Sequence, residues 1–130
     1  MKIKDDREVV LEFLRLHEPS TFDDQLAMLA EDAVYEAPFR NARVVGKENI
    51  IAGSKQGIDL RKWTKATFVD IKILATETDG LFVVTCGGDM IVPKDRVYKN
   101  KYVFFIQVTN GQISLFHEYF DTEATTQAFS

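Results

Sequence analysis

Apolar and polar residues follow two different periods in the two halves of this chain. In the first half apolar residues recur at helical spacing, as Val9 and Phe13 do, and from residue 63 onward they alternate with polar residues at the period of a strand. The first pattern predicts helices over 5–17, 21–30 and 47–55, with a short strand at 33–37. The second pattern predicts strands over 67–75, 81–90, 98–108 and 112–121.

Proline and glycine mark where these elements end. Pro38 closes the first predicted strand, and Gly57 is placed to end the third helix. Asn110-Gly111 separates two apolar runs, which is a strong hairpin signal because both residues tolerate the positive φ of a type I′ turn. Gly87-Gly88 predicts a bulge or bend, and 122–129 predicts a last helical turn.

The order of elements predicts an α+β fold. Helices come first and long strands follow, which is typical of helices gathered on one face of an antiparallel sheet. A length of 130 residues fits a single domain over 1–130. The last two predicted strands are apolar on both faces, so we expect the outer face of the sheet to be covered in a homodimer.

Composition narrows the classes of function. The chain is 45% hydrophobic and 28% charged with a net charge of −4, which argues against a nucleic-acid partner. Cys86 is the only cysteine and there are two histidines, so neither a disulfide framework nor a zinc site is expected. The start of the chain is charged rather than apolar, and no apolar run is long enough to span a bilayer. We therefore expect a cytoplasmic protein without membrane or metal.

The last predicted strand holds the main candidate for chemistry, Glu118. Alternation places Ser114, Phe116, Glu118 and Phe120 on one face, and it places Ile113, Leu115, His117, Tyr119 and Asp121 on the other. Glu118 thus stands between two phenylalanines, where a carboxylate is costly unless it is paired, protonated or used. Its pKa is expected to rise toward neutrality, which suits proton transfer; a rim ion pair or an inverted face is the structural alternative.

Other side chains are candidates for binding a ligand. Tyr98, Asn100 and Tyr102 share one face of the neighbouring strand, and the opposite assignment would turn Lys99 and Lys101 inward, which is costly. Facing inward, they would orient a substrate or stabilise an oxyanion, unless they simply pack in the core. Four more aromatic residues are candidates for the lining of the same cavity, with core packing as the alternative: Tyr35, Phe39, Trp63 and Phe116.

Three strings carry a resemblance to a known superfamily. They are LAMLAEDAVYEAPF at 26–39, VVGKENI at 44–50 and YKNKYVFFIQVTNGQISLFHEYFD at 98–121. With the order of elements, they resemble the nuclear transport factor 2-like superfamily, and most of all its SnoaL-like polyketide cyclases and phenazine-biosynthesis A/B proteins. The resemblance implies a cone-shaped α+β barrel, with three N-terminal helices packed on a curved antiparallel or mixed sheet.

The resemblance also implies roles for particular residues. In the phenazine-like branch an acidic residue of the last strand faces the cone and handles protons, which falls on Glu118 here, with Asp121 as a second candidate. His17 would lie at the mouth of the cone, either as a further acid or base or as a buried histidine bonded to a carbonyl. Epoxide hydrolases of the superfamily carry an Arg-x-Asp pair where this chain has Tyr98-x-Asn100, which argues against that reaction.

Three functions compete at this point. The first is a cofactor-free acid/base enzyme, an isomerase, cyclase or dehydratase, acting on a small, mostly apolar metabolite. The second is a non-catalytic module that binds such a metabolite in the same cone. The third is an association domain whose outer sheet face is its working surface. Fold alone does not separate them, because this superfamily hosts all three.

Overall fold

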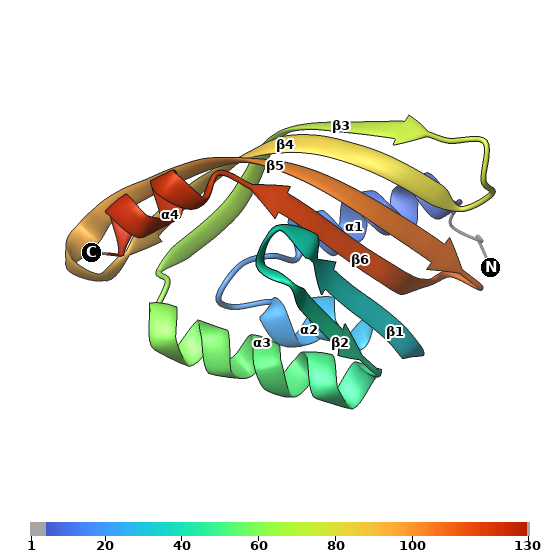
Figure 1. The fold of residues 1–130 in the computed structure, drawn as a ribbon, viewed down its shortest axis with the longest axis horizontal. Helices are drawn as coiled ribbons and strands as arrows, with labels where there is room; N and C mark the ends of the chain where they lie inside the picture. The colour runs from blue at the N-terminus through green and yellow to red at the C-terminus, as the bar shows by residue number, and fades with distance from the viewer. Residues whose placement is uncertain (1–4, 130) are drawn as a thin grey trace.

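The computed structural model describes residues 5–129, and within them the chain folds as α+β, as predicted. One curved sheet of six strands carries helices on its concave side (Figure 1). The helices are α1 (Asp6–Arg15), α2 (Phe22–Ala27), α3 (Lys47–Arg61) and α4 (Thr122–Ala128), with 3-10 turns η1 (Pro38–Arg40) and η2 (Pro93–Asp95). The strands are β1 (Leu29–Ala37), β2 (Ala42–Val45), β3 (Lys65–Ala75), β4 (Leu81–Val92), β5 (Arg96–Thr109) and β6 (Gln112–Phe120).

The sheet is mixed, with the strand order β2-β1-β6-β5-β4-β3. Strands β3 to β6 form an antiparallel meander, and β1 and β2 form an antiparallel pair. The two parts join where β1 runs parallel to β6, with Tyr35 opposite Phe116. The first and last strands of the chain are therefore neighbours, and β6 lies near the middle of the sheet.

Helices α1, α2 and α3 pack on the concave side through specific contacts. Asp5 caps α1 by accepting from the backbone N–H of Glu8, and the Phe13 ring of α1 lies 5.5 Å from that of Phe116. Gln25 of α2 donates a 3.0 Å hydrogen bond to the Phe13 carbonyl. These contacts hold α1 and α2 under the sheet, while α3 closes the open side beside β1 and β2 (Figure 1).

Several boundaries differ from the sequence prediction because tertiary contacts decide them. Strand β1 begins at Leu29, before the predicted 33, since Ile113 donates its N–H to the Met28 carbonyl and β6 draws this segment into the sheet. Helix α3 continues through Gly57 to Arg61, because the left-handed residue that ends it is Lys62. The irregularity predicted at Gly87-Gly88 is found on one side only: β3 and β4 shift register between Val69, opposite Gly87, and Lys72, whereas β4 pairs with β5 without a break. A Cβ at Gly88 would meet the Tyr102 ring at 2.7 Å.

One face assignment on the last strand is wrong for a local reason. The register of β5 and β6 shifts between Gln107 and Val108, so the strict alternation fails at the start of β6. Ile113 consequently turns inward and is fully buried in the core, opposite Val108. From Phe116 onward the alternation holds, and it carries Glu118 to the concave side.

Candidate functional site

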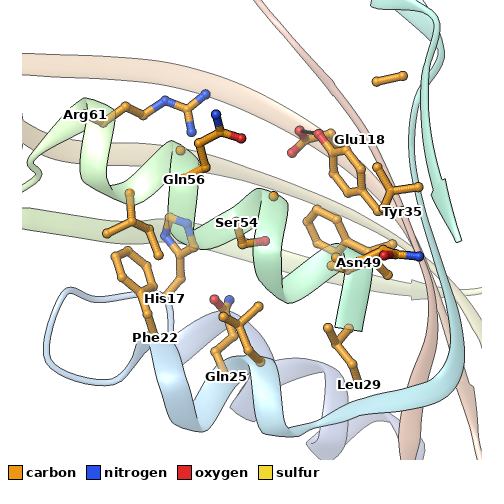
Figure 2. A pocket seen from close by; sticks show the side chains of 18 of the residues that line it. His17, Phe22, Gln25, Leu29, Tyr35, Asn49, Ser54, Gln56, Arg61 and Glu118 are labelled. Carbon is orange, nitrogen blue, oxygen red and sulfur yellow. Dashed lines mark hydrogen bonds between the residues drawn. The ribbon is translucent and has the colours of Figure 1, made fainter. Parts of the chain in front are cut away.

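A cavity of about 590 Å³ lies between the concave face of the sheet and the three N-terminal helices. We call it the larger cavity. Its lining includes the rings of Phe22, Trp63, Phe68 and Phe116. Helix α3 contributes Ser54, Gln56 and Arg61 (Figure 2). A cavity of this size, mostly apolar with a few polar groups, is typical of sites for small organic molecules.

Glu118 reaches the larger cavity from β6, as the alternation predicted. Its side chain is 15% exposed. The phenol of Tyr35 donates a hydrogen bond to Glu118 Oε1, and Arg40 Nη2 lies 4.0 Å from the same oxygen. Arg40 Nη2 also donates to the Tyr35 hydroxyl at 2.7 Å. Among residues 5–129 none donates a hydrogen bond to Oε2.

Burial raises the pKa of Glu118, because the surrounding apolar groups disfavour its charged form. The Tyr35 hydrogen bond and the nearby charges of Arg40 and Arg61 act in the opposite direction and only partly compensate. The same burial, with the adjacent carboxyl, raises the pKa of Tyr35, so its phenol stays protonated and remains a donor. The result is a carboxyl group whose two protonation states are closer in energy near neutral pH than those of an exposed glutamate.

His17 also lines the larger cavity, and it lies two residues beyond the end of α1. Its Nδ1 bonds to the Ala66 carbonyl at 2.8 Å, so this nitrogen carries the proton and Nε2 is the free acceptor. The ring stacks on Phe68 at 4.3 Å and meets Trp63 edge-on. Burial lowers the pKa of His17 to about 4, so the imidazole is neutral at physiological pH. It can orient a ligand as an acceptor in that state.

A smaller cavity of about 90 Å³ adjoins the larger one. Tyr98, Tyr102 and Phe120 line it from the sheet, and Thr125 and Phe129 line it from the C-terminal segment. Five residues border both cavities: His17, Arg61, Trp63, Phe68 and Glu118. Of the predicted lining residues, Tyr35 and Phe116 border the larger cavity, Tyr98 and Tyr102 the smaller one, and Trp63 both.

Three predicted site residues do not border either cavity. Asn100 is buried, but its amide donates to the Tyr98 hydroxyl and the Asp121 carbonyl, and its Oδ1 accepts from the Asp121 N–H. Asp121 follows β6 and caps α4, accepting from Glu123 and Ala124. Phe39 is 36% exposed in the turn after β1, with its ring packed on Phe120 at 4.8 Å. All three serve the packing around α4 and η1 rather than the cavities.

Sequence reasoning missed two arginines of the site. Arg40 lies in η1 and Arg61 in the last turn of α3, where no periodic pattern shows which way a side chain points. Both border the larger cavity. Gln56 and Ser54 of α3 also border it and were missed, since α3 was predicted to end near Gly57 with no known orientation. The one available signal was Gly53 and Gly57, four residues apart, which leave one side of this helix without side chains.

In the described part of the chain, no three His, Cys, Asp or Glu side chains gather as a group that would hold a metal ion. Within 5–129, no helix combines the length and apolar character needed to cross a lipid bilayer. Cys86 is buried, and burial raises the pKa of its thiol to about 12, which leaves it a poor nucleophile.

The sequence model of the SnoaL-like domain matches residues 10–116. This match covers most of the chain and includes both arginines, Tyr35 and His17, and it ends two residues before Glu118. The protein therefore belongs to the SnoaL-like family, as the three strings predicted. Comparison with curated proteins gave no match.

Solved structures share the fold at low sequence identity. A candidate polyketide cyclase from Pseudomonas putida superposes with a TM-score of 0.81 at 13% identity, and the match covers 98% of this chain and 100% of the cyclase chain. A candidate isomerase from Bacillus subtilis gives a TM-score of 0.79 at 18% identity, and the match covers 97% of this chain and 96% of the isomerase chain. A phenazine biosynthesis-related protein from Pseudomonas aeruginosa gives a TM-score of 0.78 at 16% identity, and the match covers 95% of this chain and 84% of that protein's chain. These likenesses establish the nuclear transport factor 2-like fold of this chain.

Proposed function

We propose that this protein is a cofactor-free acid/base enzyme that transfers a proton on a small, mostly apolar metabolite, as an isomerase, cyclase or dehydratase does. The observation that carries the proposal is the carboxyl of Glu118, buried at the wall of a roughly 590 Å³ apolar cavity with Oε2 facing no protein donor. The names of the structural neighbours, polyketide cyclase and isomerase, support this class of reaction.

The geometry around Glu118 suits proton transfer at carbon. As a carboxylate, Glu118 takes a proton from a carbon next to a carbonyl group through Oε2, and it returns the proton to another atom of the same molecule. The phenol of Tyr35 holds Oε1 and fixes the carboxyl plane. Burial raises the pKa of Glu118, which brings its ionised and protonated forms closer in energy and favours uptake of the abstracted proton.

The experiment that tests the proposal does not require the natural substrate. A panel of cyclic ketones, β-diketones and unsaturated ketones is incubated with the protein in D2O, and loss of the α-proton signal is followed by NMR. We expect accelerated exchange for some members of the panel. Glu118→Gln should reduce that rate roughly 10²- to 10⁴-fold, the usual contribution of a general base.

A matched control separates this role from a loss of folding. Glu36 lies one residue from Tyr35 on β1 and borders neither cavity, so Glu36→Gln removes a carboxylate from the same region but outside the site. It should retain the wild-type exchange rate. An unchanged rate in Glu118→Gln contradicts the proposal.

The alternative function is a non-catalytic module that binds the same class of molecule. The neutral His17, with Nδ1 committed to the Ala66 carbonyl, favours it, because Glu118 then has no ionisable partner of matched pKa across the cavity. In that case a ligand binds, no α-proton exchanges, and Glu118→Gln changes affinity alone. The two functions are thus distinguished by the same NMR experiment.

The proposal also includes a homodimer that forms through the outer face of the sheet. Val103 and Tyr119 are paired on β5 and β6 there, 37% and 39% exposed, beside Phe105. His117 Nε2 on the same face is buried without a hydrogen-bond partner. We expect a dimer by sedimentation velocity and a monomer for Tyr119→Lys; a monomeric wild type contradicts this part. A cytoplasmic location stays a prediction from the sequence.

A further inference from the structure

Four side chains decide the charge of the larger cavity. They are Arg40, Arg61, His17 and Glu118. His17 is neutral at physiological pH, and Glu118 is the one carboxyl among the lining residues. The two guanidinium groups remain charged throughout. The cavity therefore holds more positive than negative charge, although the protein as a whole carries a net charge of −4.

The two arginines are in different situations. Arg40 is committed, since its Nη2 donates to Tyr35 and lies 4.0 Å from Glu118. Arg61 borders both cavities, and no carboxylate of residues 5–129 lies within 4.0 Å of its guanidinium. Glu118 is near enough for the charge of Arg61 to act on its carboxyl, but no ion pair within 4.0 Å among the described residues occupies the guanidinium. The fork of N–H donors of Arg61, which matches a carboxylate, is therefore open to a ligand.

The position of Arg61 is defined by its neighbours. Its guanidinium carbon lies 5.6 Å from the centre of the Trp63 ring, a cation–π distance. A Cβ added at Gly57, one turn earlier, would lie 3.4 Å from Arg61 Nη1, so the guanidinium passes over this bare side of α3. In Figure 2 the Arg61 side chain extends from α3 in the direction of Glu118.

Polar and apolar groups both line the cavity, and Arg61 stands at one end of α3. Helix α3 brings Ser54, Gln56 and Arg61 to the lining beside Ile50 and Ile58, and the rings of Phe22 and Phe68 line it from other elements. A molecule with an apolar body and one polar end would place the body against the rings and the polar end toward α3. The apolar body would then extend from Arg61 toward the Glu118 carboxyl.

We infer that the ligand of this cavity is an organic anion, with an apolar, ring-sized body and a carboxylate or sulfonate group that binds Arg61. This inference names the substrate class for the proton transfer proposed above and rests on that proposal. Arg61 in this role is a binding residue that positions the ligand, and Glu118 keeps the chemistry. Neutral apolar molecules would fill the same space with lower affinity.

The test uses two fluorescent dyes that differ in a single group. 1-Anilinonaphthalene-8-sulfonate is an anion, and N-phenyl-1-naphthylamine is the same ring system without the sulfonate. Each dye is titrated into the wild type and into Arg61→Met. We expect Arg61→Met to weaken binding of the anionic dye about tenfold, the scale of one charge-assisted hydrogen bond, and to leave the neutral dye within twofold.

Two further variants serve as controls. Lys55→Met removes a cation from the same helix but from a residue that borders neither cavity, and it should leave both dyes unchanged. Gly53→Leu fills the larger cavity, since a Cβ at Gly53 meets nothing within 4 Å, and it should weaken both dyes. The inference is overturned if Arg61→Met leaves the affinity for the anionic dye within twofold of the wild type. It is also overturned if Gly53→Leu leaves the affinity for both dyes unchanged.

The same titration in Glu118→Gln separates this inference from the proposed function. If the Arg61 effect persists in the Glu118→Gln background, the anion site stands on its own, whatever the result of the exchange experiment. If Arg61→Met has no effect while Glu118→Gln abolishes proton exchange, the acid/base function stands and the anionic ligand class is wrong.

Discussion

Tyr35 of β1 and Glu118 of β6 are joined by a hydrogen bond from the phenol to the carboxyl, across the parallel pair of the sheet. Tyr35 is directly opposite Phe116, so Glu118 is its diagonal neighbour on the same face. This contact lowers the pKa of a carboxyl whose burial raises it. The two opposing effects make the protonation of Glu118 adjustable by single substitutions.

Tyr35→Phe should raise the pKa of Glu118 further, because it removes the hydrogen bond that stabilises the carboxylate and leaves the burial unchanged. The measurement is a carbon-13 NMR titration of glutamate carboxyl groups in both proteins. Tyr119→Phe, which removes a phenol from the exposed face of the same strand, is the matched control and should leave the titration of Glu118 unchanged. A fall in the Glu118 pKa in Tyr35→Phe would contradict the assigned contact.

Glu118→Gln should raise the free energy of unfolding at neutral pH. The folded state holds a proton on Glu118 more tightly than the unfolded state does. The free energy of unfolding therefore falls as the pH rises from the ordinary glutamate pKa through the raised one. Glutamine is neutral and avoids that loss. Urea unfolding between pH 4 and pH 8 should show a gain that grows with pH. A gain at pH 4 that disappears at pH 8 would reverse the sign and refute this reading.

His17 should make the protein less stable in acid. Its pKa falls from 6.5 to about 4 on folding, so the unfolded state binds more protons in this interval and stability is lost as the pH falls below 6.5. Below about pH 4 the full loss in the free energy of unfolding is about 3 kcal/mol. Urea unfolding of His17→Gln should show a lower stability at pH 7 and a flatter dependence between pH 6.5 and pH 4. Equal slopes in both proteins would contradict the burial of the neutral ring.

Alanine at two glycines should have opposite effects. Gly53 lies inside α3 with no atom within 4 Å of an added Cβ, so Gly53→Ala should stabilise the protein by roughly 0.5–1 kcal/mol. Gly80 has φ +75° and its Cβ would lie 2.4 Å from the Val108 carbonyl oxygen, so Gly80→Ala should cost at least about 1 kcal/mol. Thermal unfolding of the two variants measures both. A loss of stability in Gly53→Ala would mean that this side of α3 is covered.

Asn100→Ala should loosen α4. The side chain of Asn100 bonds both the N–H and the carbonyl of Asp121, which fixes the start of this helix. Removing the Asn100 amide leaves these backbone groups of Asp121 unpaired, which should lower the free energy of unfolding by about 2 kcal/mol. Amide exchange in 122–128 should become faster. Asn100→Asp keeps one acceptor and loses the donor, so it should lie between the wild type and alanine. Unchanged exchange in α4 would show that its other contacts, such as the 2.8 Å hydrogen bond between Tyr98 and Thr125, are sufficient to hold it.

The fold and the inward position of the Glu118 carboxyl could be predicted because both depend on short-range patterns. Alternation over Phe116, Glu118 and Phe120 is sufficient to place a carboxyl on an apolar face. The same rule predicts that Tyr98 and Tyr102 face inward, and both line the smaller cavity. The same rule failed at Ile113, since a bulge depends on the partner strand and leaves no mark in the strand that carries it.

The basic residues of the site could not be predicted in the same way. Arg40 is directed by a 3-10 turn after Pro38, and Arg61 by where α3 ends and how it lies against β1 and β2. Both depend on packing between elements that are distant in sequence. Asn100 was predicted to face inward, and it does, but its commitment to Asp121 depends on the position of α4 after β6.

The central place of β6 has a consequence for the order in which this protein can be made. Among the described strands, β6 alone links the β1–β2 pair to the β3–β4–β5 meander, and Tyr35 meets its carboxyl partner 83 residues later in the chain. A growing chain on the ribosome therefore holds two unjoined half-sheets until residues 112–120 emerge. Closing so long a loop is slow, and a chain interrupted before that point has neither a continuous sheet nor the Glu118 carboxyl.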